Sequence, residues 1–450
     1  MTPELLARYD ARVPRYTSYP TANHFGAQVG PDAYRSWLAA LPPRETLSLY
    51  LHVPFCTKLC WYCGCHTTIV NDYAAVASYG ELLLREIDLV ADAIAARHAV
   101  SHIHWGGGTP TILRSAEFTA VCERLRARFG ISPETQISVE IDPRGFTRET
   151  AAMLARDGVT RASLGVQDFD PAVQAAVNRI QSFDVTARTV DWLRAEGIAD
   201  INLDLIYGLP HQTVDSVAAT VDQTLLLAPQ QIALFGYAHV PWMKRHQRLL
   251  DERALPGTHA RWALYWAAAS RLAAHGMVPV GLDHFAAPES ALGVAAAARR
   301  LHRNFQGYTT DDAGAILGFG ASAIGTLPQG YVQNAAKIAQ YRDAIADGRL
   351  ATARGKAVTA DDRLRRDVVA ALMCNLYADV GALCRAHGRD SDALDGEIAA
   401  LAPLAADRIV TVADRVVTVS EGARPLVRSV CAAFDAYYGA ATEPRHAQAV

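Results

Sequence analysis

Strand-like and helix-like runs alternate along the first half of the chain, and this order restricts the fold more than any other feature. Residues 47–53 alternate strictly between apolar and polar side chains, as a half-buried strand does. Further strand-like runs lie at 101–105, 137–142, 162–167, 201–206 and 231–236. Amphipathic stretches separate them, near 75–98, 115–129, 148–157, 184–196 and 214–227. The alternation predicts an α/β protein with a parallel sheet.

The same pattern divides the chain into three expected parts. These are an N-terminal arm and lead-in (1–43), an open six-stranded (β/α) barrel with an extension (44–335) and a mainly helical C-terminal domain (336–450). The run at 278–282 is expected to extend the barrel, and strand signals fade after it. Polar and glycine residues gather after the strands, where parallel α/β folds bind their ligands.

The C-terminal part has the pattern of two helices and a small hairpin at 407–412 and 415–419. This order suggests a winged-helix-like module, a type that often binds DNA. The chain carries a net charge of −3 and has no basic stripe, so we expect no nucleic-acid partner and a packing or lid role instead.

The N-terminal arm contains the run from Val13 to Pro20, which has proline near both ends. Proline disfavours helix at the preceding residue, so the run is expected to be extended. Two roles remain open from the sequence: the arm wraps the surface, or it closes the mouth of the barrel.

Cysteine usage and hydropathy indicate a reduced, cytoplasmic protein. No run of 18 or more apolar residues is present, so neither a transmembrane helix nor a membrane partner is expected. The first residues lack the basic and apolar sections of a signal peptide. Only 8 cysteines occur in 450 residues, which does not suggest a disulfide framework. Four of them are isolated and are interpreted as small buried hydrophobes: Cys122, Cys374, Cys384 and Cys431.

The other four cysteines fall within ten residues, directly after the strand-like run at 47–53, with the spacing Cys56-x3-Cys60-x2-Cys63-x-Cys65. A structural zinc site usually needs two ligand pairs that are a dozen or more residues apart. A thioredoxin-like pair would leave two of the thiols unexplained. Three thiolates on one compact loop can instead hold three corners of a cubane iron–sulfur cluster and leave the fourth iron open.

Residues beside this loop are the first candidates for a site. Tyr50 and His52 share one face of the preceding strand, so alternation aims both the same way, although satisfied strand residues would look identical. We expect His52 to act in catalysis. Residues 106–109, Gly-Gly-Gly-Thr, follow another strand and allow close approach of a ligand to the backbone. A phosphate loop is excluded, because no Gly-Lys-Ser/Thr ending is present.

Three polar residues lie on successive strands: Glu140, Gln167 and Asp204. Their side chains can accept or donate hydrogen bonds to ribose hydroxyls or to an ammonium group. Each alone could be a satisfied core polar group, but three at one end of a barrel favour a binding site. Arg179 could pair with a carboxylate or could be an ordinary surface arginine.

The spacing CxxxCxxC resembles that of the radical S-adenosylmethionine enzymes. In that superfamily the three cysteines ligate a 4Fe-4S cluster, and S-adenosylmethionine binds the open iron and is cleaved to a 5′-deoxyadenosyl radical. Longer segments are similar to the oxygen-independent coproporphyrinogen III dehydrogenases (oxidases): PRYTSYPT, LYLHVPFCTKLCWYCGC, HWGGGTPT, EIDPR, GVQDF, VNRIQ, NLDLIYGLPHQT, YAHVPW, GLDHFA, LHRNFQGYTT and GASAIG. The resemblance runs from residue 13 to about residue 435.

This resemblance implies a reaction, cofactors and site residues. The reaction is oxidative decarboxylation of two propionates of coproporphyrinogen III to vinyl groups, giving protoporphyrinogen IX in anaerobic heme biosynthesis. Cys56, Cys60 and Cys63 would ligate the cluster, and Cys65 would not. The first of two S-adenosylmethionine molecules would contact Tyr50, Gly107, Glu140, Ala238 and Ile324. The second would contact Tyr62, Gly108, Thr109, Gln167, Arg179 and Asp204.

The resemblance also implies an electron donor such as flavodoxin or ferredoxin, and a monomer. Arg15 of the arm would be placed to meet a substrate carboxylate. Two alternatives of the same fold remain: a heme chaperone and a heme-degrading radical methyltransferase. The chaperones typically have Phe in place of Cys65, lack the arm and carry an HNxxYW string, whereas this chain reads HRNFQGY at 302–308. The methyltransferase would be expected to lack the arm and much of the string set.

Overall fold

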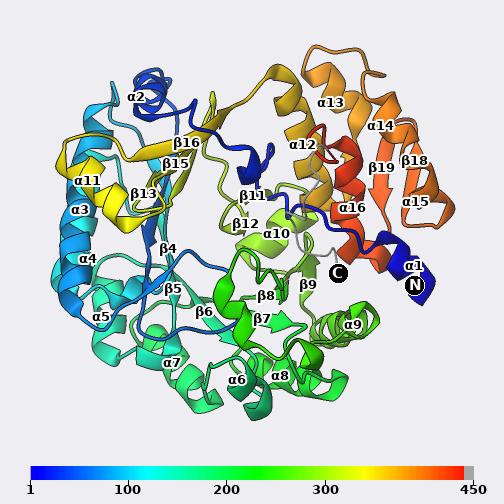
Figure 1. Cartoon of the computed structure of the whole chain (residues 1–450), viewed down its shortest axis with the longest axis horizontal. Coiled ribbons are helices and arrows are strands. Elements are labelled where there is room, and N and C mark those ends of the chain that lie inside the picture. The colour runs from blue at the N-terminus through cyan, green and yellow to red at the C-terminus, as the bar shows by residue number, and fades with distance from the viewer. Residues whose placement is uncertain (1, 440–450) are drawn as a thin grey trace.

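The computed structural model describes residues 2–439 of the chain. Its main feature is a sheet of twelve strands (Figure 1). Their spatial order is β16 (Thr352–Ala357), β15 (Gly330–Asn334), β14 (Ile324–Leu327), β13 (Ala315–Phe319), β1 (Leu47–Val53), β4 (Val100–Gly107), β5 (Gln136–Ile141), β6 (Arg161–Gln167), β7 (Asp200–Tyr207), β8 (Gln231–Gly236), β10 (His284–Ala286) and β9 (Val278–Val280).

The six strands expected from the sequence, β1 and β4 to β8, form the parallel centre of this sheet. Each parallel pair is joined through a helix that covers the outer face, as parallel connections require (Figure 1). These helices are α3 (Tyr73–Asp92), α4 (Ser115–Arg128), α5 (Arg148–Arg156), α6 (Pro171–Ala176), α7 (Phe183–Ala195) and α8 (Val214–Leu226). The predicted open (β/α) barrel is therefore confirmed.

Strand content after residue 282 was underestimated from the sequence. β13 pairs in parallel with β1, with Leu47 opposite Ala315, and β14 to β16 continue the sheet in antiparallel pairs. On the other side, β9 and β10 extend it from β8, as expected for residues near 278. The missed strands are short and contain glycine and charged residues, so they lack the strong alternation of a central strand. Because β16 ends at Ala357, the sheet runs past residue 336.

Smaller elements complete the barrel side of the molecule. They are β2 (Phe55–Cys56), β3 (Thr68–Ile69), α2 (Pro31–Ala39), α9 (Thr258–Ala274), α10 (Ala291–Ala297), the hairpin β11 (His302–Asn304) and β12 (Gly307–Thr309), and α11 (Ile338–Ala346). A continuous apolar core joins the sheet to its outer helices; Leu47, Leu49 and Leu51 are almost fully buried within it.

The C-terminal part has a separate apolar core. It contains α12 (Ala360–Asn375), β17 (Tyr377–Asp379), α13 (Val380–Ala386), α14 (Asp395–Ala399), α15 (Ala402–Ala406), β18 (Val410–Ala413), β19 (Val416–Val419) and α16 (Val427–Cys431). The expected hairpin is present as β18 and β19, and β17 pairs with β19 to make a three-stranded sheet. In the part of the chain that the structure describes, no helix is both long and apolar enough to span a bilayer.

The N-terminal arm belongs to both halves of the molecule. Helix α1 (Pro3–Tyr9) lies beside the C-terminal helices (Figure 1), and Leu6, Tyr16 and Tyr19 are buried in their core. Residues 13–20 contain no helix, as the prolines predict. Directly before Tyr16, Arg15 turns toward the barrel and its Nη2 donates to the carbonyl of Gly236 at 3.0 Å. The arm therefore packs against one domain while reaching into the other.

Candidate active site

The four-cysteine loop begins where β1 ends, at the carboxyl edge of the parallel strands. Cys56 lies on the short strand β2, which pairs with β3 so that Cys56 stands opposite Ile69. The pairing closes residues 57–67 into a compact loop. All four thiols of the loop, which are free in the structure, line one cavity of about 160 Å³.

Hydrogen-bond donors surround the three sulfurs expected to bind iron. Cys56 Sγ accepts from Thr67 Oγ1 at 3.2 Å and from Thr109 Oγ1 at 3.4 Å. Cys60 Sγ accepts from Arg144 and Arg179 at 3.3 and 3.5 Å, and Cys63 Sγ from the N–H of Cys65 at 3.4 Å. Such donors favour thiolate, the form that binds metal.

The thiols differ in acidity. Hydrogen bonding from Cys65 lowers the pKa of Cys63 to about 6, whereas burial raises the pKa of Cys56. Within residues 2–439, no three His, Cys, Asp or Glu side chains converge on a single metal position. Each thiolate of a cubane binds a different iron, so convergence on one point is not required. Three compact thiols with donors to each sulfur therefore fit an iron–sulfur cluster.

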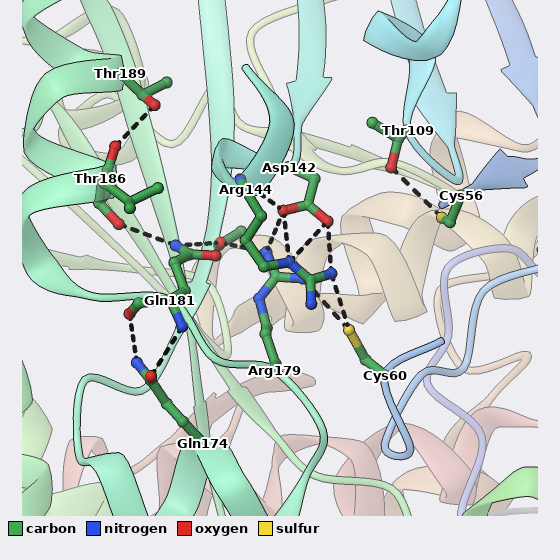
Figure 2. A network of polar contacts seen from close by, with 12 residues as sticks. Cys56, Cys60, Thr109, Asp142, Arg144, Gln174, Arg179, Gln181, Thr186 and Thr189 are labelled. Carbon is green, nitrogen blue, oxygen red and sulfur yellow. Dashed lines mark hydrogen bonds and ion pairs between the residues drawn. The ribbon is translucent and has the colours of Figure 1, made fainter. Parts of the chain in front are cut away.

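A buried ion-pair network fixes Cys60 from the other side (Figure 2). Arg144 Nη2 lies 2.6 Å from Asp142 Oδ2, and Arg179 Nη2 lies 3.3 Å from Asp142 Oδ1. Burial works against ionisation of Asp142, but the two guanidinium groups hold its pKa below the ordinary value. Arg179 is 6% exposed and lies outside the helices, so it is not the ordinary surface arginine that remained open from the sequence.

The loop that carries Arg179 is itself tied down. Arg179 Nη2 donates to the carbonyl of Gly165 at 2.6 Å, and Gln181 Nε2 donates to the same carbonyl at 3.1 Å. Gln181 also bonds Thr186 of α7 and the side chain of Gln174 (Figure 2). The guanidinium is therefore held in place before any ligand arrives.

The glycine run after β4 permits a close approach, as its sequence predicts. A Cβ on Gly107 would lie 2.6 Å from the His52 ring, and one on Gly108 would lie 2.5 Å from the carbonyl of Phe55. Gly107 has φ of 112°, which an L side chain rarely adopts. The turn brings the N–H of Gly107 to 3.0 Å from Glu140 Oε2.

Glu140 and Asp204 present two differently tuned carboxylates. Burial opposes ionisation of Glu140, but His104 at 3.2 Å and the Gly107 N–H hold its pKa below the ordinary value. Burial and the charge of Glu140 raise the pKa of Asp204 to about 6, although Asn202 Nδ2 donates to it at 2.7 Å. Gln167 lies nearby at a bulge of β6 with φ of 74°, a conformation uncommon outside glycine.

Tyr50 and His52 have different surroundings although they share a strand face. Tyr50 lines a cavity of about 500 Å³ that adjoins the cluster cavity, and its OH lies 2.8 Å from His52 Nδ1. His52 lines neither cavity, and its Nε2 lies 2.9 Å from the carbonyl oxygen of His66. Burial lowers the pKa of His52. Its ring therefore orients Tyr50 and the cluster loop.

The cavity of about 500 Å³ is larger than the cluster cavity and adjoins it. The two share Tyr62, Cys63, Cys65, Glu140, Ser163, Gln167 and Asp204. Of the other expected ligand contacts, Ala238 lines the larger cavity, and Gly107, Gly108, Thr109 and Arg179 line the smaller. Ile324, on β14, lines neither.

Basic side chains line the larger cavity away from the cluster loop. Solvent reaches Arg15 through the cavity, yet protein surrounds the guanidinium, and burial lowers its pKa. Arg161 and His284 line the same cavity, and burial also lowers the pKa of Arg161. Arg161 and His284 were missed from the sequence. The string GLDHFA contained the histidine, but no pattern marked it or the first residue of β6 as facing a site.

Comparison with known proteins agrees with this geometry. The family model "Radical SAM superfamily" matches residues 50–224. Oxygen-independent coproporphyrinogen III oxidase of Bradyrhizobium diazoefficiens is 51% identical over 438 residues, which cover 97% of each chain. The enzyme of the same name from Paracoccus denitrificans is 43% identical over 98% of this chain and 97% of its own.

A solved structure is similarly close. Coproporphyrinogen III oxidase from Escherichia coli, described as a radical SAM enzyme, superposes with a TM-score of 0.90 at 37% identity and covers 95% of this chain and 100% of its own. The fold and the four-cysteine loop agree with these similarities. The chain belongs to the family of oxygen-independent coproporphyrinogen III oxidases within the radical SAM superfamily.

Proposed function

We propose that this chain decarboxylates two propionates of coproporphyrinogen III oxidatively to vinyl groups and releases protoporphyrinogen IX. The observation that carries the proposal is the shared wall between the cluster cavity and the larger basic cavity. Because Cys63 is part of this wall, a cluster held by the loop would adjoin a space that suits a polyanionic ligand. Pockets for small molecules commonly have volumes of about 300–1,000 Å³, and this cavity lies in that range.

We propose Cys56, Cys60 and Cys63 as the ligands of a 4Fe-4S cluster, with S-adenosylmethionine on the open iron. When bound, the cluster and S-adenosylmethionine supply a 5′-deoxyadenosyl radical that can remove a hydrogen atom from the β-carbon of a propionate. The chain's own contribution is to bind, orient and shield these partners. Glu140 offers an ionised acceptor for an ammonium group, and its bond to the Gly107 N–H fixes that acceptor.

The remaining expected contacts are carried over as proposals. Tyr50, Gly107, Glu140, Ala238 and Ile324 would contact the first S-adenosylmethionine, and Tyr62, Gly108, Thr109, Gln167, Arg179 and Asp204 the second. Of these, Ile324 has the weakest support, because it lies outside both cavities. For His52 we propose a positioning role, since both ring nitrogens already have partners.

The larger cavity suits a tetracarboxylate. Within residues 2–439, no carboxylate lies within ion-pair distance of Arg15, although the negative charge of Asp283 acts against the lowering of its pKa by burial. The Arg15 guanidinium faces the cavity, where a substrate propionate would form a charge-assisted hydrogen bond with it. Arg15 also comes from the arm, so this segment would help to shield a reactive substrate from solvent.

We further propose a one-electron donor such as flavodoxin or ferredoxin, a monomer, and a cytoplasmic location. Thiolate ligands require a reducing compartment, which supports the last point. The decisive experiment is anaerobic turnover of coproporphyrinogen III with S-adenosylmethionine and dithionite, followed by mass spectrometry of the porphyrins. Successive loss of two carboxyl groups is expected, and Cys60→Ser is the inactive control. Tight heme binding without any decarboxylation would support the chaperone alternative instead.

A further inference from the structure

Two segments outside the barrel strands attach directly to the backbone of the cluster loop. The segment at 240–250 reaches three of its carbonyls: Lys244 Nζ donates to Cys65 O at 2.9 Å, His246 Nε2 lies 2.7 Å from Cys63 O, and Gln247 Nε2 donates to Tyr62 O at 3.0 Å. The segment at 173–182 holds the opposite side, through Asn178 Nδ2 to Leu59 O at 2.7 Å. The three segments therefore form one surface, which we name the cluster-loop face.

The cluster-loop face exposes large apolar side chains, and the guanidinium of Arg12 lies over one of them, 5.2 Å from the ring centre of Trp242. Ile180 is 67% exposed, Trp242 43%, Met243 57% and Leu249 56%. These are four of the nine large hydrophobic side chains that the described part of the chain exposes. Grouped exposed apolar residues mark interaction sites, and Trp and Met are enriched at interfaces.

The charge of this face differs from that of the whole chain. No Asp or Glu occurs in 56–69, 173–182 or 240–250, although the chain has 46 acidic residues and a net charge of −3. Asp251 and Glu252 follow directly, but Asp251 lies 3.1 Å from Arg253 and Glu252 lies 3.0 Å from His239. Exposed basic residues do occur there: Lys58 inside the cluster loop, and Arg245 and Arg248 beside the apolar group. A local positive field on a mildly negative protein selects an acidic partner and steers its approach.

The place of this face indicates what kind of partner it receives. Lys58 lies between Cys56 and Cys60 and lines the cluster cavity together with their thiols, so the cluster-loop face adjoins the sulfurs. A cluster that must be reduced one electron at a time needs its donor close, because electron transfer slows steeply with distance. Encounters between redox proteins typically use small interfaces, which a mixed apolar and basic group of this kind can supply.

We infer that the cluster-loop face is the docking surface for an acidic one-electron carrier protein; this rests on the proposed function, which requires external reduction of the cluster. The carrier's carboxylates would meet Arg245 and Arg248, and its apolar rim would cover Trp242, Met243 and Leu249.

The test is a charge reversal that avoids the ligand-binding residues. The double variant Arg245→Glu/Arg248→Glu is compared with Arg188→Glu/Arg385→Glu, which makes the same change of charge at exposed positions on α7 and α13. Binding of an acidic flavodoxin and of an acidic plant-type ferredoxin to the cluster-loaded enzyme is measured by calorimetry at low and high salt. The first double variant should weaken binding at least tenfold at low salt, with a smaller loss at high salt, while the control binds nearly as the parent does.

A second measurement separates docking from chemistry. The rate of cluster reduction, followed by absorbance, should fall in the first double variant with the carrier protein as reductant and stay unchanged with dithionite. Unchanged carrier binding in Arg245→Glu/Arg248→Glu, or equal weakening in both double variants, would overturn the docking surface. Failure of the proposed function would appear differently, as absence of protoporphyrinogen in the dithionite-driven reaction of the parent enzyme.

Discussion

A buried glutamate behind the active site gives the sharpest test of the structure. Glu86 of α3 is 2% exposed and accepts hydrogen bonds from the N–H of Gly320 at 2.6 Å, from Asn334 Nδ2 at 2.6 Å and from Tyr341 OH at 2.8 Å. It joins α3 to the turn after β13, the end of β15 and α11. That turn presses on the end of β1, since a Cβ on Gly320 would lie 2.4 Å from the carbonyl of His52.

Burial raises the pKa of Glu86 from 4.5 to about 7. The folded chain therefore keeps the proton after the unfolded chain has lost it. The contribution of this proton to stability is complete below pH 4.5, declines as the pH rises to about 7, and then stays constant. Since one pH unit corresponds to about 1.4 kcal/mol, the loss amounts to about 3 kcal/mol.

The variant Glu86→Gln removes this titration and keeps the shape of the side chain. In one orientation of the new amide, its oxygen still accepts from the Gly320 N–H and the Tyr341 OH. Its NH₂ group then faces the NH₂ group of Asn334, so Asn334 must rotate its own amide to present an acceptor. That mismatch costs roughly 1–3 kcal/mol at every pH. The difference in unfolding free energy between variant and parent should therefore shift by about 3 kcal/mol in favour of the variant between pH 4.5 and pH 8.

The assay is urea unfolding followed by fluorescence across this pH range, supported by hydrogen exchange of the peptide that contains Gly320. Glu117→Gln is the matched control for loss of a carboxylate, because Glu117 also accepts from a tyrosine, Tyr73, at 2.6 Å. Parallel pH curves for Glu86→Gln and the parent would refute the reasoning, since they would mean that Glu86 titrates alike in the folded and unfolded chain.

The remaining predictions concern the site. Cys60→Ser should abolish iron incorporation, whereas Cys65→Ser should retain it; equal loss of iron by both would contradict a three-thiolate cluster. Glu140→Gln and Asp204→Asn should each weaken S-adenosylmethionine binding roughly tenfold to a hundredfold with iron content intact, and unchanged dissociation constants in both would return these residues to a structural role. Arg15→Gln should raise KM for coproporphyrinogen III roughly tenfold or more while 5′-deoxyadenosine formation without substrate persists, and a normal KM would remove this arginine from substrate binding.

The Arg15→Gln variant tests the arm more selectively than deletion of the whole arm would. Leu6, Tyr16 and Tyr19 are buried among the C-terminal helices, so removing residues 1–20 would expose an apolar core as well as open the cavity. From the sequence alone the arm was a surface wrapping or a lid. In the structure, Tyr16 and Tyr19 pack against the C-terminal helices while Arg15 lines the larger cavity, a division between neighbouring residues that no periodicity marks.

Local patterns predicted the centre of the fold well. Strict alternation at 47–53 gave β1, and the glycines at 106–108 correctly indicated a close backbone approach. The pairing of β1 with β13 was not predictable in this way. Leu47 pairs with Ala315, and such a pairing depends on the whole chain rather than on the alternation in either strand.

The candidate site residues show the same difference between local and long-range information. Cys56, Cys60 and Cys63 could be predicted as candidate ligands because ligand spacing is a local property of the sequence. The ion pairs of Asp142 with Arg144 and Arg179 were not recognisable, because Arg179 lies on a separate loop 37 positions away and its burial is set by tertiary packing. The roles of Arg161 and His284 depend likewise on which strand ends meet around the larger cavity.

The positions of charged side chains around the two cavities fit one cationic and one anionic ligand. The shared wall carries carboxylates, Glu140 and Asp204, whereas Arg15 and Arg161 line only the larger cavity. A cosubstrate with a sulfonium and an ammonium group is attracted to the wall, and a tetracarboxylate to the arginines beyond it. In the cluster cavity the positive charges of Arg144 and Arg179 are paired with Asp142, so the charge that Arg15 adds to the larger cavity favours a carboxylate ligand there rather than next to the cysteines.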